Sequence, residues 1–372
     1  MGNNERRYDI DWLRVLAMLM IFLFHSARFF NYEDWHVKNN QLDFGMSIFV
    51  EVVSQWIMPL FFILSAISVY YALDFRNNRS FINERFKRLV IPLVFGIFVL
   101  VPPQVYIERV SHSQFAGSFI QFFPHYFDGL YGLGGNFAWM GLHLWYLEML
   151  FIFSLLTLPL FRFLRKETMR NFISQLAKKP GIIFLLAIPI FFMELLVNLQ
   201  PDGIGMRNFG GWSPFTYLVF FIIGYLVASN AQFMGSIEKN RNIALLLGVL
   251  MTITGFLLPE AGSQMYFLES LRAFNSWFWL LAILGFGSKY LNFNNVLLKY
   301  SNEAVLPFYI LHQTIIVIVG FYIASWDVGV ISKYLILSTV SFAMIIASYD
   351  LVIKRAKVLR FLFGMKTRQG VN

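Results

Sequence analysis

Three ionisable residues open and close one apolar stretch near the start of the chain. Asp11 and Arg14 are three residues apart, so on a helix they are neighbours on one face. His25 follows Arg14 by eleven residues, which is about three helical turns plus roughly 20°, or about 16 Å along the axis. Ionisable groups inside a membrane span are costly and mark candidate functional sites. The alternative is that Arg14 reaches the interface and His25 bonds a neighbouring helix.

A second candidate is a basic cluster after the second apolar stretch. Arg85 and Arg88 are three residues apart, with Lys87 between them, on an expected short helix leading into the third span. Two guanidinium groups on one helix face can clamp an anion such as phosphate. The alternative is a purely topological role, because basic loops anchor membrane spans.

Two further polar residues lie inside expected spans. Glu148 stands about one and a half turns below the outer end of the fourth span, and it must be paired, protonated or solvated there. An acid or base role and a structural role both remain open for it. His312 lies well inside the ninth span, with Tyr309 and Gln313 nearby, and a satisfied interhelical histidine is the commoner explanation for such a residue.

Several chemistries are excluded by composition. The chain has no cysteine, so it has no disulfide, thiolate metal site or cysteine nucleophile. The six histidines are scattered, with none three or four residues from another, so we predict no metal site. Neither a Walker motif nor a dinucleotide-binding fingerprint is present. The reactive group must therefore come from elsewhere, such as an activated soluble donor.

The elements that position these residues are expected to be membrane helices. The 372 residues are 58% hydrophobic and 14% charged, which predicts an all-α, polytopic integral membrane protein. We predict one domain over 1–372, with a basic cytoplasmic tail at about 353–372. Ten stretches are long enough to span a membrane: 12–30, 47–73, 89–106, 142–161, 181–199, 214–230, 243–259, 271–288, 304–324 and 331–352.

The distribution of basic residues predicts the orientation. Most of the 30 Lys and Arg residues fall on one side if the N-terminus is cytoplasmic, which places both termini inside. This asymmetry accounts for the net charge of +9 without a nucleic-acid partner. Two outer loops, 32–44 and about 108–141, are rich in aromatic residues, which argues against disorder. Those residues either form an aromatic belt or stack on a sugar.

Several of these patterns resemble a known family. The separation of Arg14 and His25, the segment MPLFFILS at 58–65 and the basic motif RFKR at 85–88 resemble the membrane-bound acyltransferase-3 family. One departure is Ala66, where the family usually has glycine. Other stretches are similar to a glucan-modifying branch of that family; they lie at 7–17, 35–39, 101–104, 143–146 (which includes Trp145) and 302–313 (which includes Tyr309 and His312).

The resemblance implies a reaction and roles. It implies transfer of an acyl group from cytoplasmic acyl-coenzyme A to a hydroxyl of an extracytoplasmic glycan, at the inner membrane of the cell. Succinyl-coenzyme A is the implied donor in the glucan branch, and acetyl-coenzyme A is the alternative. The catalytic histidine of the family falls on His25 and its first-span arginine on Arg14. Its basic motif falls on Arg85 and Arg88.

The sequence leaves two mechanisms open for His25 and three functions open for the protein. His25 can act as a general base on the sugar hydroxyl, or it can carry the acyl group as a covalent relay. Asp11 or Glu148 are candidates to orient its ring, and Arg85, Lys87 and Arg88 to bind the donor phosphates. A transporter or flippase for a glycan or lipid-linked intermediate is the main rival, and a membrane sensor or assembly subunit is the third. The expected partners are membrane lipids, the glycan and acyl-coenzyme A.

Overall fold

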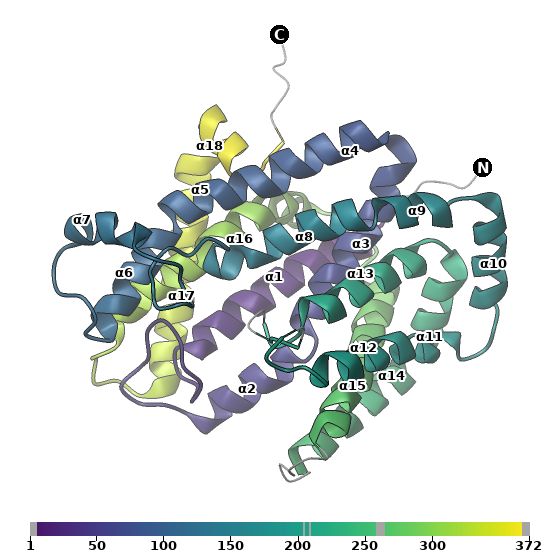
Figure 1. The fold of residues 1–372 in the computed structure, drawn as a ribbon, viewed down its shortest axis with the longest axis horizontal. Coiled ribbons are helices and arrows are strands. Elements are labelled where there is room, and N and C mark those ends of the chain that lie inside the picture. Colours follow the sequence, from purple (N-terminus) through teal and green to yellow (C-terminus); the bar gives the residue numbers. More distant parts are fainter. Residues whose placement is uncertain (1–5, 204, 208–209, 258–264, 367–372) are drawn as a thin grey trace. The chain divides into compact units, whose positions relative to one another are not determined.

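The computed structural model describes residues 6–203, 205–207, 210–257 and 265–366. Within them it contains helices and an isolated β-bridge between Leu130 and Phe137, and no strand, which confirms the all-α prediction. Contacts divide the chain into two compact units. Figure 1 shows the helices from which they are built. Unit 1 comprises 1–17, 52–81 and 152–298, and unit 2 comprises 18–51, 82–151 and 299–372.

Both units are built of helices. Unit 1 holds the start of α1 (Tyr8–Arg28), then α3 (Ile57–Phe75), α9 (Leu158–Leu164), α10 (Glu167–Ala177), α11 (Ile182–Leu185), α12 (Ala187–Asn198), α13 (Pro214–Ala228), α14 (Ala231–Leu257) and α15 (Met265–Tyr290). Unit 2 holds the rest of α1, most of α2 (Phe44–Ser54), then η1 (Phe86–Val90), α5 (Ile91–Val99), α6 (Val101–Ser111), α7 (Phe119–Phe122), η2 (Phe123–Phe127), η3 (Leu142–Leu144), α16 (Val296–Ile323), α17 (Val330–Ser348), η4 (Tyr349–Ile353) and α18 (Lys357–Leu362). Helices α4 (Asn78–Arg85) and α8 (Trp145–Leu156) have residues in both units, and the first three residues of α16 belong to unit 1.

Length and composition identify the helices that can cross a membrane. Among the described residues six helical segments qualify, or up to eight if each of two bent pairs is one span. All ten apolar stretches predicted from the sequence overlap a helix, but α13 is shorter than a typical span. The protein is therefore multi-pass, while the count of ten and the cytoplasmic placement of both termini stay predictions. The last residues of the predicted tail, 367–372, lie outside the described residues.

Helix α1 is one unbroken α-helix of 21 residues. Asp9 and Asp11 lie in its first turn, and His25 and Arg28 lie in its last turn. Negative charge near the N-terminus and positive charge near the C-terminus complement the helix dipole. The predicted helix that carries Asp11, Arg14 and His25 is thus present.

The interface of α3 and α13 in unit 1 depends on one glycine. A Cβ atom on Gly224 of α13 would lie 2.8 Å from the backbone Cα and O of Ile63, and 3.1 Å from the Cβ of Ala66. Ala66 stands where the resembling family usually has glycine. The close approach of the two helices is therefore achieved with a glycine on the partner helix, as is typical of membrane helix interfaces.

Gly224→Ala is expected to force α3 and α13 apart, because the contacts of the new methyl group are with backbone that cannot rotate away. Overpacking of this kind costs about 1–3 kcal/mol, so the midpoint of thermal unfolding should fall. Gly235→Ala on α14 is the matched control, since its Cβ would meet nothing within 4 Å. Equal unfolding midpoints for the two variants would contradict this account of the interface.

Two further carboxylates, on α12 and η4, have close partners within their own units. In unit 1, buried Glu194 lies 2.5 Å from the hydroxyl of Thr216 and 2.8 Å from Arg207. In unit 2, Asp350 accepts a 2.7 Å hydrogen bond from Tyr300. Burying a carboxylate without such partners would be costly.

The segment between α1 and α2 is fixed in unit 2 by backbone carbonyls gathered around a lysine. The Nζ atom of Lys38 donates to the carbonyl oxygens of Arg28, Asn31 and Glu33 at 2.5–2.9 Å. Burial lowers the pKa of Lys38 to about 8. Lys333 of α17 donates to the side chain of Asn39 in the same segment at 2.7 Å. The segment is therefore tied to its own turn and to α17.

Candidate functional site

The candidate site in unit 2 is built around a pair of histidines. Nδ1 of His25 lies 2.8 Å from Nε2 of His312, although 287 residues separate them. The two rings are 16° from parallel, with centroids 5.0 Å apart. His312 is fully buried, whereas His25 is partly exposed. Nδ1 of His312 lies 2.5 Å from the carbonyl oxygen of Tyr309, three residues earlier on α16.

These contacts fix the protonation of both neutral rings. A carbonyl oxygen only accepts, so Nδ1 of His312 carries its proton and donates to Tyr309. Nε2 of His312 is then the lone-pair nitrogen, and it accepts from the Nδ1 proton of His25. The remaining nitrogen of His25, Nε2, therefore presents a lone pair, and it has no hydrogen-bond partner among the described residues. A nitrogen in this state can take a proton from a substrate.

A third histidine lies against this pair. The rings of His143 and His312 are nearly perpendicular, with centroids 5.1 Å apart, and Nε2 of His143 lies 3.2 Å from the carbonyl oxygen of Ile310. A tight turn places His143, because Gly141 and Leu142 both have left-handed backbone conformations, with φ of 75° and 50°. A positive φ at leucine is unusual and indicates a backbone held by its surroundings.

The charged pair at the start of α1 has its own partners in unit 1. Arg14 lies 3.1 Å from Asp11, as its i, i+3 spacing predicts, and also donates to the hydroxyl of Ser68 at 2.8 Å. Asp11 is in addition 2.8 Å from Arg6. The contact that holds the His25 ring comes from His312, which differs from our suggestion that Asp11 or Glu148 orients it.

Glu148 and Trp145 lie on the first turns of α8. One carboxylate oxygen of Glu148, Oε2, is buried without a hydrogen-bond partner among the described residues. The ring of Trp145 contacts Tyr146, whose ring in turn contacts Tyr309 at a centroid distance of 5.9 Å. The structure thus places Tyr146 against Tyr309, three residues before His312, while Glu148 has no hydrogen bond to the histidine pair among the described residues.

The basic cluster begins at the end of α4, where the helix changes its pitch. The expected short helix is present as α4, and it continues through a π-helical turn at Phe86–Val90, so that Asn78–Ser111 is one helical run. A π-turn is frequent at functional sites. Arg88 is 44% exposed and lies 3.7 Å from Glu84, and Lys87 is also exposed. Positive charge is therefore accessible on this turn.

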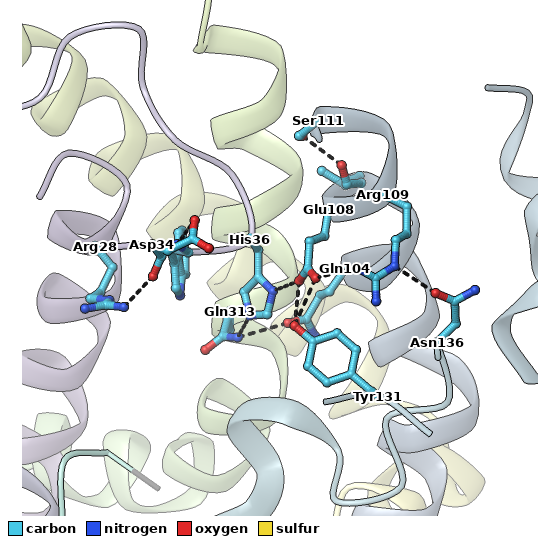
Figure 2. Close-up of polar contacts among 12 residues, drawn as sticks. Arg28, Asp34, His36, Gln104, Glu108, Arg109, Ser111, Tyr131, Asn136 and Gln313 are labelled. Atoms are coloured by element: carbon cyan, nitrogen blue, oxygen red, sulfur yellow. Dashed lines mark hydrogen bonds and ion pairs between the residues drawn. The ribbon is translucent and has the colours of Figure 1, made fainter. Parts of the chain in front are cut away.

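A polar cluster that the sequence analysis missed lies in the same unit (Figure 2). Glu108 of α6 contacts His36 Nδ1 and accepts from the hydroxyl of Tyr131 at 2.8 Å. Glu108 lies on the helical run Asn78–Ser111, which is long and apolar enough to cross a membrane, but our third predicted span ended at 106 and excluded it. His36 stands inside the 35–39 stretch that carries the family resemblance, and that stretch was the available signal.

A multi-pass helical fold that pairs a buried histidine with a partly exposed one defines a membrane protein able to perform proton-transfer chemistry. The chain belongs to the acyltransferase-3 family, because the acyltransferase domain model of that family matches residues 7–350. It is accordingly a membrane acyltransferase, which favours the enzyme over a transporter or flippase.

Curated relatives extend over nearly the whole chain. The chain is 24% identical to glucans biosynthesis protein C of Salmonella schwarzengrund (strain CVM19633) over 377 residues. This alignment covers 97% of the chain and 95% of that protein. The same values hold for glucans biosynthesis protein C of Salmonella typhi. The protein of that name from Escherichia coli (strain SMS-3-5 / SECEC) is 24% identical over 382 residues, with the same coverage. No solved structure matches the chain.

Proposed function

We propose that this protein transfers an acyl group from cytoplasmic acyl-coenzyme A to a hydroxyl group of an extracytoplasmic glycan. A glucan is the favoured acceptor, because the relatives are named for glucan biosynthesis. Succinyl is the favoured acyl group and acetyl the alternative. The proposal places the protein in the inner membrane with both termini in the cytoplasm. The observation that carries the proposal is the free Nε2 lone pair of His25 opposite an anchored Nδ1.

In the proposed reaction His25 is the general base. Its Nε2 takes the proton of a sugar hydroxyl while that oxygen attacks the thioester carbonyl carbon. The new C–O bond forms, the C–S bond breaks, and the coenzyme leaves as a thiolate that recovers the proton. The imidazolium formed in between is stabilised because His312 accepts from its Nδ1 proton. In the alternative relay, Nε2 itself attacks the thioester and forms an acyl-histidine.

Positive charge at the π-turn suits the other end of the donor. Coenzyme A carries phosphates at its nucleotide end, and Arg85, Lys87 and Arg88 offer groups that bind phosphate well. In this proposal Arg14 has a supporting role on Asp11, to which it is already bonded. Glu148, with one unpartnered carboxylate oxygen, is a candidate to bind a donor group of the substrate.

The direct test uses purified protein in lipid nanodiscs with acyl-labelled succinyl- or acetyl-coenzyme A and a soluble glucan. We expect label to move to the glucan as an ester that mild base removes, with release of free thiol. Movement of glycan or lipid without loss of the acyl group from the donor would overturn the proposal. Acid quenching before glucan is added separates the two routes, since only the relay leaves label on the protein.

Neutralising Arg85 or Arg88 with glutamine is expected to raise the KM for the acyl donor about tenfold, because a charge-assisted hydrogen bond contributes roughly 1.5 kcal/mol or more. The KM for the glycan should stay within twofold. Arg79→Gln, on the exposed part of α4, is the control and should change neither constant. An equal rise in both KM values at Arg85 or Arg88 would point to a topological role for these residues.

A further inference from the structure

The segment between α1 and α2 reaches His25 through a tryptophan. The indole of Trp35 lies 16° from parallel to the His25 ring, with centroids 6.4 Å apart. Trp35 is partly exposed, so one part of its surface is available to a ligand. It stands in an irregular segment and not on a lipid-facing helix end, which sets it apart from a membrane-belt residue.

The next residue, His36, is held from both sides. Its Nδ1 contacts Glu108, and its Nε2 lies 3.0 Å from the amide nitrogen of Gln313 (Figure 2). An amide nitrogen only donates, so Nε2 accepts and Nδ1 carries the proton that is donated to Glu108. Gln313 directly follows His312. Two consecutive residues of the segment therefore meet the site, with Trp35 on His25 and His36 on Gln313.

The hydrogen bonds continue on the far side of Gln313. The Gln313 amide also donates to Gln104 at 3.2 Å, and Gln104 donates to the Thr314 hydroxyl at 2.7 Å. Thr314 in turn donates to the carbonyl oxygen of Leu100 at 3.0 Å. A buried network whose members all have partners is rigid and favours one arrangement. The position of His36 is therefore fixed against α6 and α16.

Glu108 carries the other end of the anchor. It accepts from both Tyr131 and Arg109, and Arg109 also donates to Asn136 at 2.8 Å. Burial and the nearby Glu108 carboxylate raise the pKa of Tyr131, so its phenol stays a neutral donor. The second long outer segment, which contains Tyr131 and Asn136, is thus bonded to the same carboxylate. His36 is therefore held by the Glu108 carboxylate, which is itself stabilised by α6 through Arg109 and by the outer segment through Tyr131.

We propose that Trp35 is the platform on which a pyranose ring of the acceptor glycan stacks, and that the His36–Glu108 bond holds this platform beside His25. The C–H face of a pyranose is apolar and fits a flat aromatic surface, while its hydroxyls remain at the edge. A ring seated on Trp35 is adjacent to the base that must take its proton. This inference rests on the proposed function and assigns it an acceptor subsite.

The first experiment compares Trp35→Ala and Trp35→Phe in the nanodisc assay with labelled acyl-coenzyme A and a glucan. We expect Trp35→Ala to raise the glucan KM about tenfold and Trp35→Phe about threefold, as loss of an aromatic contact does, with the donor KM unchanged. Trp139→Ala, which removes an exposed tryptophan of the other outer segment, is the matched control and should leave both constants unchanged. An unchanged glucan KM for Trp35→Ala overturns the platform.

The second experiment tests the anchor with His36→Ala, alone and combined with Trp35→Ala. If His36 acts only by positioning Trp35, the single change should raise the glucan KM about three- to tenfold, and the double variant should be no worse than Trp35→Ala. Additive effects in the double variant overturn the positioning role. Wild-type protein that acylates no glucan overturns the proposed function. Normal transfer by the wild type with an unaffected Trp35→Ala variant overturns this inference alone.

Discussion

His25→Ala is expected to lower kcat for acyl transfer by about 10²–10⁴-fold, the range that a positioned general base contributes. The physical reason is that the Nε2 lone pair is removed while the rest of the site is retained. The KM for the acyl donor should change little, because the groups proposed to bind phosphate lie at the end of α4 and on the π-turn, and not on α1. The measurement is the initial rate of label transfer to glucan, with expression and the thermal unfolding midpoint recorded in parallel.

A matched histidine provides the control. His125 in η2 is exposed and bonded to Asp128, so His125→Ala removes an imidazole from the same unit without touching the pair. It should retain full activity. If His25→Ala also retained full activity in folded protein, His25 would have no part in the mechanism. The proposed general-base reaction would then be wrong.

His312→Leu is expected to lower kcat by about 10²-fold while leaving the KM values for donor and glycan nearly unchanged. Without an acceptor at this position the His25 ring can rotate or adopt the other tautomer, and a wrong tautomer is very costly in a histidine-based site. The imidazolium formed during the reaction also loses the group that stabilises it. Steady-state kinetics in both substrates separate this effect on kcat from a loss of binding.

His312→Gln distinguishes positioning from packing. Glutamine is similar in size to leucine, but its side-chain oxygen can accept from Nδ1 of His25. We expect kcat of the His312→Gln variant to be at least tenfold higher than kcat of the His312→Leu variant. If both variants lost the same activity, or if both mainly raised KM, His312 would matter for packing alone and another group would have to orient His25.

Local features of the sequence were sufficient for much of the fold. Apolar length and composition predict an all-helical membrane protein, because a lipid environment requires every backbone polar group to be bonded within the segment. The spacing of Asp11 and Arg14 predicts their ion pair, since helical periodicity alone brings them together. Membership of the acyltransferase-3 family could also be predicted from the sequence, because the motifs of that family are short and contiguous in the chain.

The helix pitch and the ends of the membrane spans were harder to predict from the sequence. The π-turn at Phe86–Val90 changes the angle between Arg85 and Arg88 from the one that an ideal α-helix predicts. No residue type in this segment predicts a π-turn. Ending the third span at 106 hid Glu108, because hydropathy falls gradually toward a helix end. Placing the predicted boundary two residues before Glu108 was enough to leave this carboxylate out of the candidate residues.

The sequence by itself determined that His25 is an ionisable group inside a membrane helix and that it needs a partner. Only the tertiary structure decided that this partner is His312, that Nδ1 is the bonded nitrogen, and that Trp35 lies against the ring. The reason is that helical periodicity governs contacts within a few turns, whereas the pairing of α1 with α16 depends on how distant helices pack. A tautomer is set by that pairing, so it follows from the fold and not from residue order.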